Sequence, residues 1–211
     1  IEAMGYAAEA IRSYAVFARL RDEGVVPGGV RFQVSIPTAV ALTTGFVEMS
    51  SRAAAEPIVE AALAREVAAI ANAIPHDLLA IQWDVCQEVL GADGGMPLHY
   101  DDIVAASIDR VARHLGFVPA DVQAGIHLCY GDPGHKHVIE PVDLGTCVVC
   151  ANGIVAASPR PLDFVHMPVP RDRNDDAYFA SLAGLDLPDA TKLFMGLVHH
   201  TDGMEGTRAR L

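Results

Sequence analysis

The chain has 211 residues, of which 51% are hydrophobic and 20% are charged, as is typical of a globular domain with one sizeable core. Its formal net charge of -12 disfavours nucleic acids and anionic membranes as partners, because both bind basic surfaces. No apolar segment approaches the ~20 residues of a membrane-spanning helix. Four cysteines are too few for a disulfide scaffold, so we expect a protein of the reducing cytoplasm.

Helical and β-type patterns alternate along the chain. Apolar residues at helical spacing predict helices over residues 6–20, 56–74, 101–115 and 144–157. Short, mainly apolar segments predict strands over residues 31–36, 78–85, 122–129, 162–169 and 192–200. This alternation indicates βα units and a parallel sheet, in which we expect the five strands to be adjacent in chain order. Both ends of the sequence lie within helical patterns, so we expect it to be part of a longer chain.

Polar residues follow each predicted strand, at or just after its carboxyl end. They are Thr38; Gln82 and Asp84; His127 and Cys129; His166; and His199, His200 and Asp202. Active sites lie at this edge both in TIM barrels and in open doubly wound sheets. The glycine-rich nucleotide-binding motifs of open sheets are absent from the sequence. We therefore predict a TIM (β/α)8-type barrel, present here as a single incomplete domain over residues 1–211.

His127 and Cys129 have the spacing of metal ligands on a strand. Residues two apart point to the same side of a strand, so the imidazole and the thiol are presented together. Thiolate sulfur and imidazole nitrogen are typical zinc ligands, and a catalytic zinc keeps one position open for substrate. The alternative is that both are buried core residues.

Gln82 and Asp84 place an amide and a carboxylate on one side of an otherwise apolar strand. An ionised, buried Asp84 is costly unless it is paired with a cation, so it either binds a substrate group or forms a structural hydrogen bond. His199 and His200 point to opposite sides of the last predicted strand, so at most one faces the barrel mouth. Histidine is the usual acid or base at neutral pH, which makes this pair the candidate catalytic residues.

Two further patterns favour structural roles. His135 and His137 lie in a loop rich in glycine and proline, where histidines are usually solvated. Cys147 and Cys150 form a C-x-x-C within an apolar helical segment that lacks a second cysteine pair, so core packing is favoured over metal binding or redox chemistry.

Four segments together resemble the catalytic domain of cobalamin-independent methionine synthase, in the barrel superfamily that includes uroporphyrinogen decarboxylase. Residues 81–84 (IQWD) resemble the family's I-Q-x-D-E-P strand, and residues 126–130 (IHLCY) resemble its zinc-binding H-x-C-Y strand. Residues 35–38 (SIPT) are similar to its G-P-x-T element, and residues 196–200 (GLVHH) resemble its penultimate strand. The resemblance extends from about Phe32 to the end of the sequence.

The sequence departs from this family at two of the four zinc ligands. Pro168 lies near the place of the family's glutamate ligand, and His166 is two residues earlier on the same side. The family's last zinc cysteine lies on an eighth strand, after residue 211. Val85 and Cys86 also stand where the family has Glu-Pro.

The resemblance implies a zinc-dependent methyl or alkyl transferase that uses a thiol and an activated carbon as substrates. His127 and Cys129 would bind the zinc, and Asp84 would hold the ammonium group of an amino-acid thiol. Thr38, Gln82 and His166 are the other candidate substrate-binding residues. The alternatives are a barrel that has lost metal and acts as a binding or scaffold protein, and a zinc-dependent hydrolase or lyase. The sequence leaves a homo-oligomer open and does not name the thiol or the donor.

Overall fold

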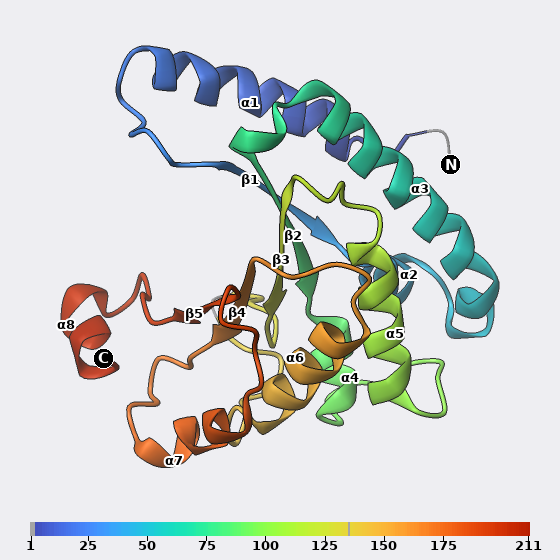
Figure 1. The fold of residues 1–211 in the computed structure, drawn as a ribbon. Helices are drawn as coiled ribbons and strands as arrows, with labels where there is room; N and C mark the ends of the chain where they lie inside the picture. Colours follow the sequence, from blue (N-terminus) through green and yellow to red (C-terminus); the bar gives the residue numbers. More distant parts are fainter. Residues whose placement is uncertain (1–2, 135) are drawn as a thin grey trace.

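A computed structural model of the protein describes residues 3–134 and 136–211. The strands are β1 (Phe32–Pro37), β2 (Leu79–Val85), β3 (Gln123–Leu128), β4 (Phe164–Pro168) and β5 (Lys192–Gly196). The helices are α1 (Tyr6–Asp22), α2 (Ala39–Phe46), α3 (Arg52–Ala73), α4 (Gln87–Ala92), α5 (Ile103–Leu115), α6 (Gly145–Ala157), α7 (Asp176–Phe179) and α8 (Gly203–Ala209). Strands and helices alternate as the sequence predicts (Figure 1).

The five strands form one parallel sheet in the order β1-β2-β3-β4-β5. Parallel pairing in chain order confirms the prediction for these strands, and it places all their carboxyl ends at one edge of the sheet. Within the described residues β1 and β5 each pair with a single strand, so the sheet is open. The structure is therefore a mixed α/β sheet compatible with part of a barrel, and a closed barrel is not seen.

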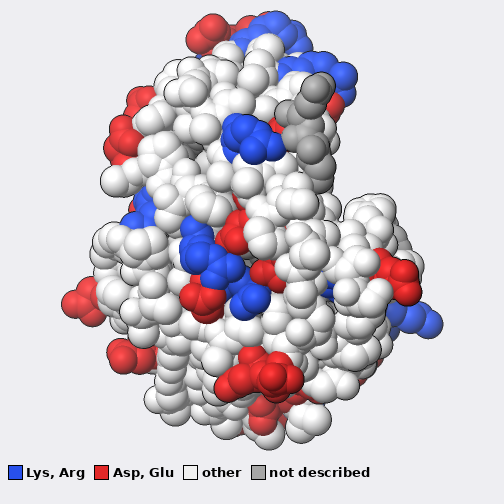
Figure 2. Space-filling model, turned by 90° about the vertical axis from the view of Figure 1, so that its right-hand side faces the viewer, with Lys and Arg blue, Asp and Glu red and all other residues white. Residues whose placement is uncertain are grey.

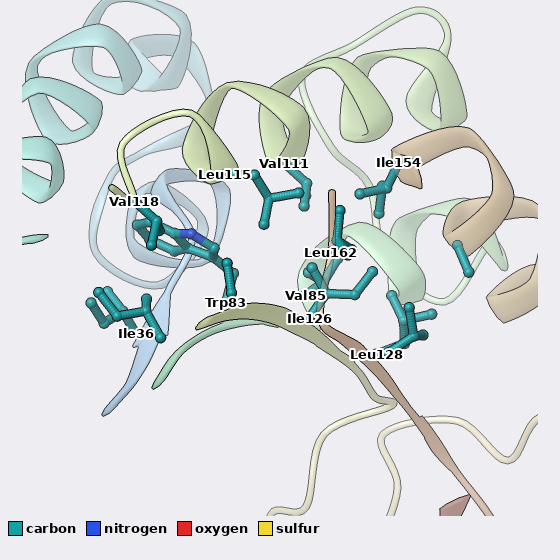
Figure 3. Close-up of a cluster of buried hydrophobic side chains, with 14 of the residues drawn as sticks. Ile36, Trp83, Val85, Val111, Leu115, Val118, Ile126, Leu128, Ile154 and Leu162 are labelled. Atoms are coloured by element: carbon teal, nitrogen blue, oxygen red, sulfur yellow. The ribbon is translucent and has the colours of Figure 1, made fainter. Parts of the chain in front are cut away.

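The two faces of the sheet differ in chemistry. One face carries apolar side chains that pack beneath the helices, and Figure 3 shows Trp83, Val85 and Ile126 there, opposite Val111 and Leu115 of α5. Alternate residues point to the other face, and many of these are polar; they include Gln33, Ser35, Gln82, Asp84, His127 and His166. Parallel sheets are usually covered and apolar on both faces. A polar face at this position marks where a functional site is expected.

Charges on the molecular surface are mixed in sign. Figure 2 shows lysine and arginine next to aspartate and glutamate on the face that it presents, without a broad basic patch. Among the ion pairs between helices, Arg110 binds the buried Glu56, and Arg113 binds Glu60. Among the described residues, no helix combines the length and the apolar character needed to cross a membrane.

The last strand is shorter than predicted. The sequence predicts a strand over residues 192–200, whereas β5 ends at Gly196. A tight turn follows at once, in which the Leu197 amide donates to the Met195 carbonyl (2.9 Å). His199 and His200 therefore lie in a loop, and the prediction that they point to opposite sides of a strand is wrong. Short helices α2 and α4 were not predicted, because eight and six residues give too little periodicity.

Gly125 on β3 lies directly beneath the ring of Phe164 on the neighbouring strand. A Cβ at residue 125 would overlap that ring. We expect Gly125→Ala to lower the free energy of unfolding by about 1–3 kcal/mol, as overpacking does in a filled site. Gly28→Ala is the matched control, because nothing lies within 4 Å of a Cβ there. Urea unfolding of the two variants measures the difference, and equal stabilities would contradict the predicted packing.

Candidate functional site

The strand register brings Asp84, His127 and His166 side by side on the polar face. Asp84 pairs with His127, and His127 pairs with His166, on three neighbouring parallel strands. The Nδ1 atoms of the two histidines are 2.7 Å apart, and their rings are stacked with centroids 4.6 Å apart. Only one of these nitrogens can donate in such a hydrogen bond, so the pair shares a single proton.

Cys129 follows β3 and contacts two other side chains. Its thiolate accepts hydrogen bonds from the thiol of Cys86, which follows β2, and from the imidazole of His127. Gly131 lies next to this arrangement, and a Cβ there would be in ordinary van der Waals contact with the Cys86 sulfur (3.7 Å). Gly131 also has a φ of 74°, which favours glycine. We call Cys86, Cys129, His127 and His166 the thiol–imidazole cluster.

Cys86 is the member of this cluster that the sequence did not identify. In the comparison with the methionine synthase motifs, Val85 and Cys86 only replaced the Glu-Pro that follows I-Q-x-D in the family. The available signal was positional: Cys86 comes directly after β2, as Cys129 comes directly after β3. Residues that follow neighbouring parallel strands lie close together at one edge of a sheet, so this position was the signal that could have predicted the contact between the two thiols.

The cluster stabilises a thiolate at Cys129. The Cys86 hydrogen bond and the nearby His127 hold the pKa of Cys129 well below its usual range, although burial opposes them. The pKa of Cys86 is raised, first by its hydrogen bond to Cys129 and then by burial. Burial acts to lower the pKa of His127, but its contacts with Cys129 and Asp84 outweigh this and raise it. Burial, helped by the charge of His127, lowers the pKa of His166 to about 4, so this ring is neutral at pH 7.

Asp84 lies on the same polar face and has an amide as its hydrogen-bond partner. Gln82 donates from Nε2 to the Asp84 carboxylate (2.8 Å), and it is itself bonded to Gln33 and Ser35. Burial raises the pKa of Asp84, against the effects of the Gln82 hydrogen bond and the charge of His127. None of the ion pairs found among the described residues gives Asp84 a lysine or arginine partner. His127 is its charged neighbour, and none of these lysines or arginines competes with a cationic ligand group for the carboxylate.

Thr38 is not brought to this cluster. It is fully buried, and its hydroxyl accepts from the Ala41 amide as the N-cap of α2 (3.1 Å). Burial raises the pKa of Glu88 to about 7, and the Thr38 side chain opposes this rise. These contacts are structural, and a substrate-binding role for Thr38 stays a prediction.

His199 and His200 line a cavity of about 500 Å³. The described residues around it come from the loop after β3, from the loop after β4, which includes Arg171 and Arg173, and from the loop after β5. His199 Nε2 bonds the Val169 carbonyl oxygen (2.7 Å). The described lining does not include the thiol–imidazole cluster, so the catalytic role of either histidine stays a prediction. His137 also lines the cavity, whereas His135 lies outside the described residues.

The donor types in the cluster suit zinc. Two thiols and two imidazoles are the soft and borderline ligands that zinc prefers. In the described part of the chain, no group of three or more His, Cys, Asp or Glu side chains already surrounds a point where a metal ion would fit. Cys147 and Cys150, by contrast, are buried in α6, which agrees with their expected packing role.

No protein-family model matches the chain, and no curated protein sequence matches it. A crystal structure from Listeria monocytogenes, described as a "Putative Vitamin-B12 Independent Methionine Synthase", aligns with a TM-score of 0.48 and 15% identity. The alignment covers 89% of this chain and 53% of that one, so this chain spans about half the length of that protein. At this level of similarity neither a family nor an activity follows.

We predict that Cys129 reacts with iodoacetamide at nearly the same rate at about pH 6 and pH 8 in metal-free, reduced protein. An ordinary cysteine loses roughly 100-fold of its thiolate over this interval. Cys86→Ala removes the main hydrogen bond to the thiolate, so it should raise the pKa of Cys129 and restore a steep pH dependence. Mass spectrometry of the labelled peptides gives the rates. A steep dependence in the unmodified protein would show that Cys129 is an ordinary thiol.

Proposed function

We propose that the chain carries the metal-binding part of a zinc-dependent enzyme that transfers a methyl or alkyl group to a thiol. The observation that supports this most is the contact between the Cys129 thiolate and the His127 imidazole at the carboxyl edge of a parallel sheet. A protein thiolate at neutral pH is uncommon and is what a zinc ligand requires. The resemblance of residues 81–84 and 126–130 to the methionine synthase motifs points to the same chemistry.

In this proposal His127 and Cys129 hold the metal. When bound, zinc lowers the pKa of a substrate thiol, which is then a thiolate nucleophile at neutral pH. His166 is neutral at this pH and hydrogen-bonds His127, so it orients that ring. Asp84, positioned by Gln82 on the same face, offers a carboxylate to a substrate ammonium group.

A second candidate is a binding protein that has lost the metal and the reaction. It is favoured by the finding that no three metal-ligating side chains converge within the described residues. A zinc-dependent hydrolase or lyase would use the same donors but would need no thiol substrate. Metal content separates the binding protein from both enzymes, and thiol binding monitored by zinc X-ray absorption separates the transferase from the hydrolase.

If the proposal is correct, protein purified with zinc and a reducing agent contains close to one equivalent of zinc. We expect Cys129→Ser to contain far less and to remain folded, because the core forms without this residue. Cys150→Ala is the control for loss of a cysteine outside the site, and it should keep its zinc. Metal analysis with circular dichroism checks both. Unchanged zinc in Cys129→Ser would end the proposal.

If the thiol is an amino acid, Asp84→Asn should weaken its binding by roughly 2 to 5 kcal/mol, the range for removing one partner of a buried charge pair. The test compares homocysteine with γ-mercaptobutyrate, which is the same thiol without the amine. Binding of the second compound should change far less.

Asp77→Asn is the matched control for Asp84→Asn, because Asp77 is exposed and precedes β2 at the opposite edge of the sheet. Titration calorimetry gives the affinities, and melting temperatures show whether stability has changed. Equal losses for the two thiols in Asp84→Asn would assign this carboxylate a structural role and leave no reason to favour an amino-acid thiol.

A further inference from the structure

We infer that Cys86 is a third protein ligand of the proposed zinc site, together with Cys129 and His127, and that His166 orients His127 from outside the ligand set. This rests on the proposed function. Neither Cys86 nor His166 corresponds to a zinc ligand of the methionine synthase motifs. The two family ligands without a counterpart in this sequence are a glutamate and a later cysteine.

The contacts of Cys129 support a role for Cys86. The Cys129 sulfur lies within hydrogen-bonding contact of both the Cys86 sulfur and the His127 ring, so two thiols and one imidazole are already neighbours. Cys86 occupies the N-cap position of α4, but its side chain makes no capping hydrogen bond. Both Cys86 and Cys129 are partly exposed, unlike Cys147 and Cys150, which are buried in α6. Cys86 packs partly against the core, but its sulfur is not committed to a capping hydrogen bond that would compete with metal binding.

The protons that Cys86 and His127 donate to the Cys129 sulfur lie between the three atoms that would bind the metal. The Cys129 thiolate accepts one hydrogen bond from Cys86 and one from His127, and a zinc ion bound to all three atoms would replace both protons. Among the described residues these three donors do not yet converge on a single point. Rotation of the two cysteine side chains between staggered rotamers is the change that would bring the three donors together around a metal.

The geometry of His166 suits a positioning residue better than a ligand. Its Nδ1 meets Nδ1 of His127 at 2.7 Å, which leaves Nε2 of His127 for the metal. Its own Nε2 points toward β5, where a Cβ at Gly196 would be 3.4 Å away. Ligating histidines usually bond a second group through their other ring nitrogen, and that group fixes the orientation of the ring.

A set of two cysteines and one histidine leaves the fourth tetrahedral position open. Catalytic zinc sites have three protein ligands and an exchangeable one, and a two-cysteine, one-histidine set is one of the known combinations. The open position is where a substrate thiol would bind. Such a site needs no ligand beyond the residues of this chain.

The test measures metal affinity in the full chain after removal of zinc under reducing conditions. Cobalt replaces zinc, and its sulfur-to-cobalt charge-transfer band reports how many thiolates are bound. We expect Cys86→Ser and Cys129→Ser each to lose one of the two thiolate contributions and to weaken metal binding strongly. His166→Asn should keep both contributions and lose about 10–100-fold in affinity, as expected for a partner outside the ligand set. Cys150→Ala is the control and should match the unmodified protein.

A second measurement needs no substitution. In the unmodified protein, zinc should protect both Cys86 and Cys129 from alkylation by iodoacetamide, whereas the metal-free protein should be labelled at both.

Protection of Cys129 alone, or a Cys86→Ser variant with unchanged affinity and band intensity, would overturn the role of Cys86 and leave the proposed function standing. Failure of the unmodified protein to bind zinc would overturn both. A His166→Asn variant that loses cobalt as completely as Cys129→Ser would make His166 a ligand and overturn its positioning role.

Discussion

Parallel pairing in chain order is the constraint on which the site depends. It places the carboxyl ends of all five strands at one edge, and it sets the register that aligns Asp84, His127 and His166 across three strands. The helices that connect the strands cover the apolar face, which leaves the other face to polar residues (Figure 1). A shift of one residue in the pairing of β3 would turn His127 toward the helices and separate it from its partners.

Much of the fold followed from the sequence, because its main elements have strong periodic patterns. All five strands and four long helices were predicted within a few residues, as was the parallel order. The short helices were missed, since two turns carry little periodic signal. The end of β5 was placed too late, because apolar residues 197 and 198 continue the β-type pattern beyond the turn at Gly196.

The site was only partly predictable, for a different reason. His127 and Cys129 stand two residues apart on one strand, so their spacing was visible in the sequence. Cys86 meets Cys129 through the pairing of two strands, and nothing in its local sequence distinguishes it from a packing cysteine. Thr38 is the opposite case, a residue that the sequence assigned to the site and that the structure does not bring to the thiol–imidazole cluster. It follows a strand as the site residues do, but a threonine there also caps a helix, and its buried hydroxyl does so.

Strands β2 and β5 differ sharply in burial. Six of the seven residues of β2 are buried, whereas β5 is exposed or half-buried along its length and, in the part of the chain that the structure describes, pairs with β4 alone. Local opening follows such differences, because exposed backbone hydrogen bonds break without disturbing the core. Amide hydrogen exchange should thus be slow beneath the two thiols and fast near His199 and His200. The ligand atoms would then be attached to the rigid part of the molecule, while the neighbouring cavity wall can rearrange around whatever enters it.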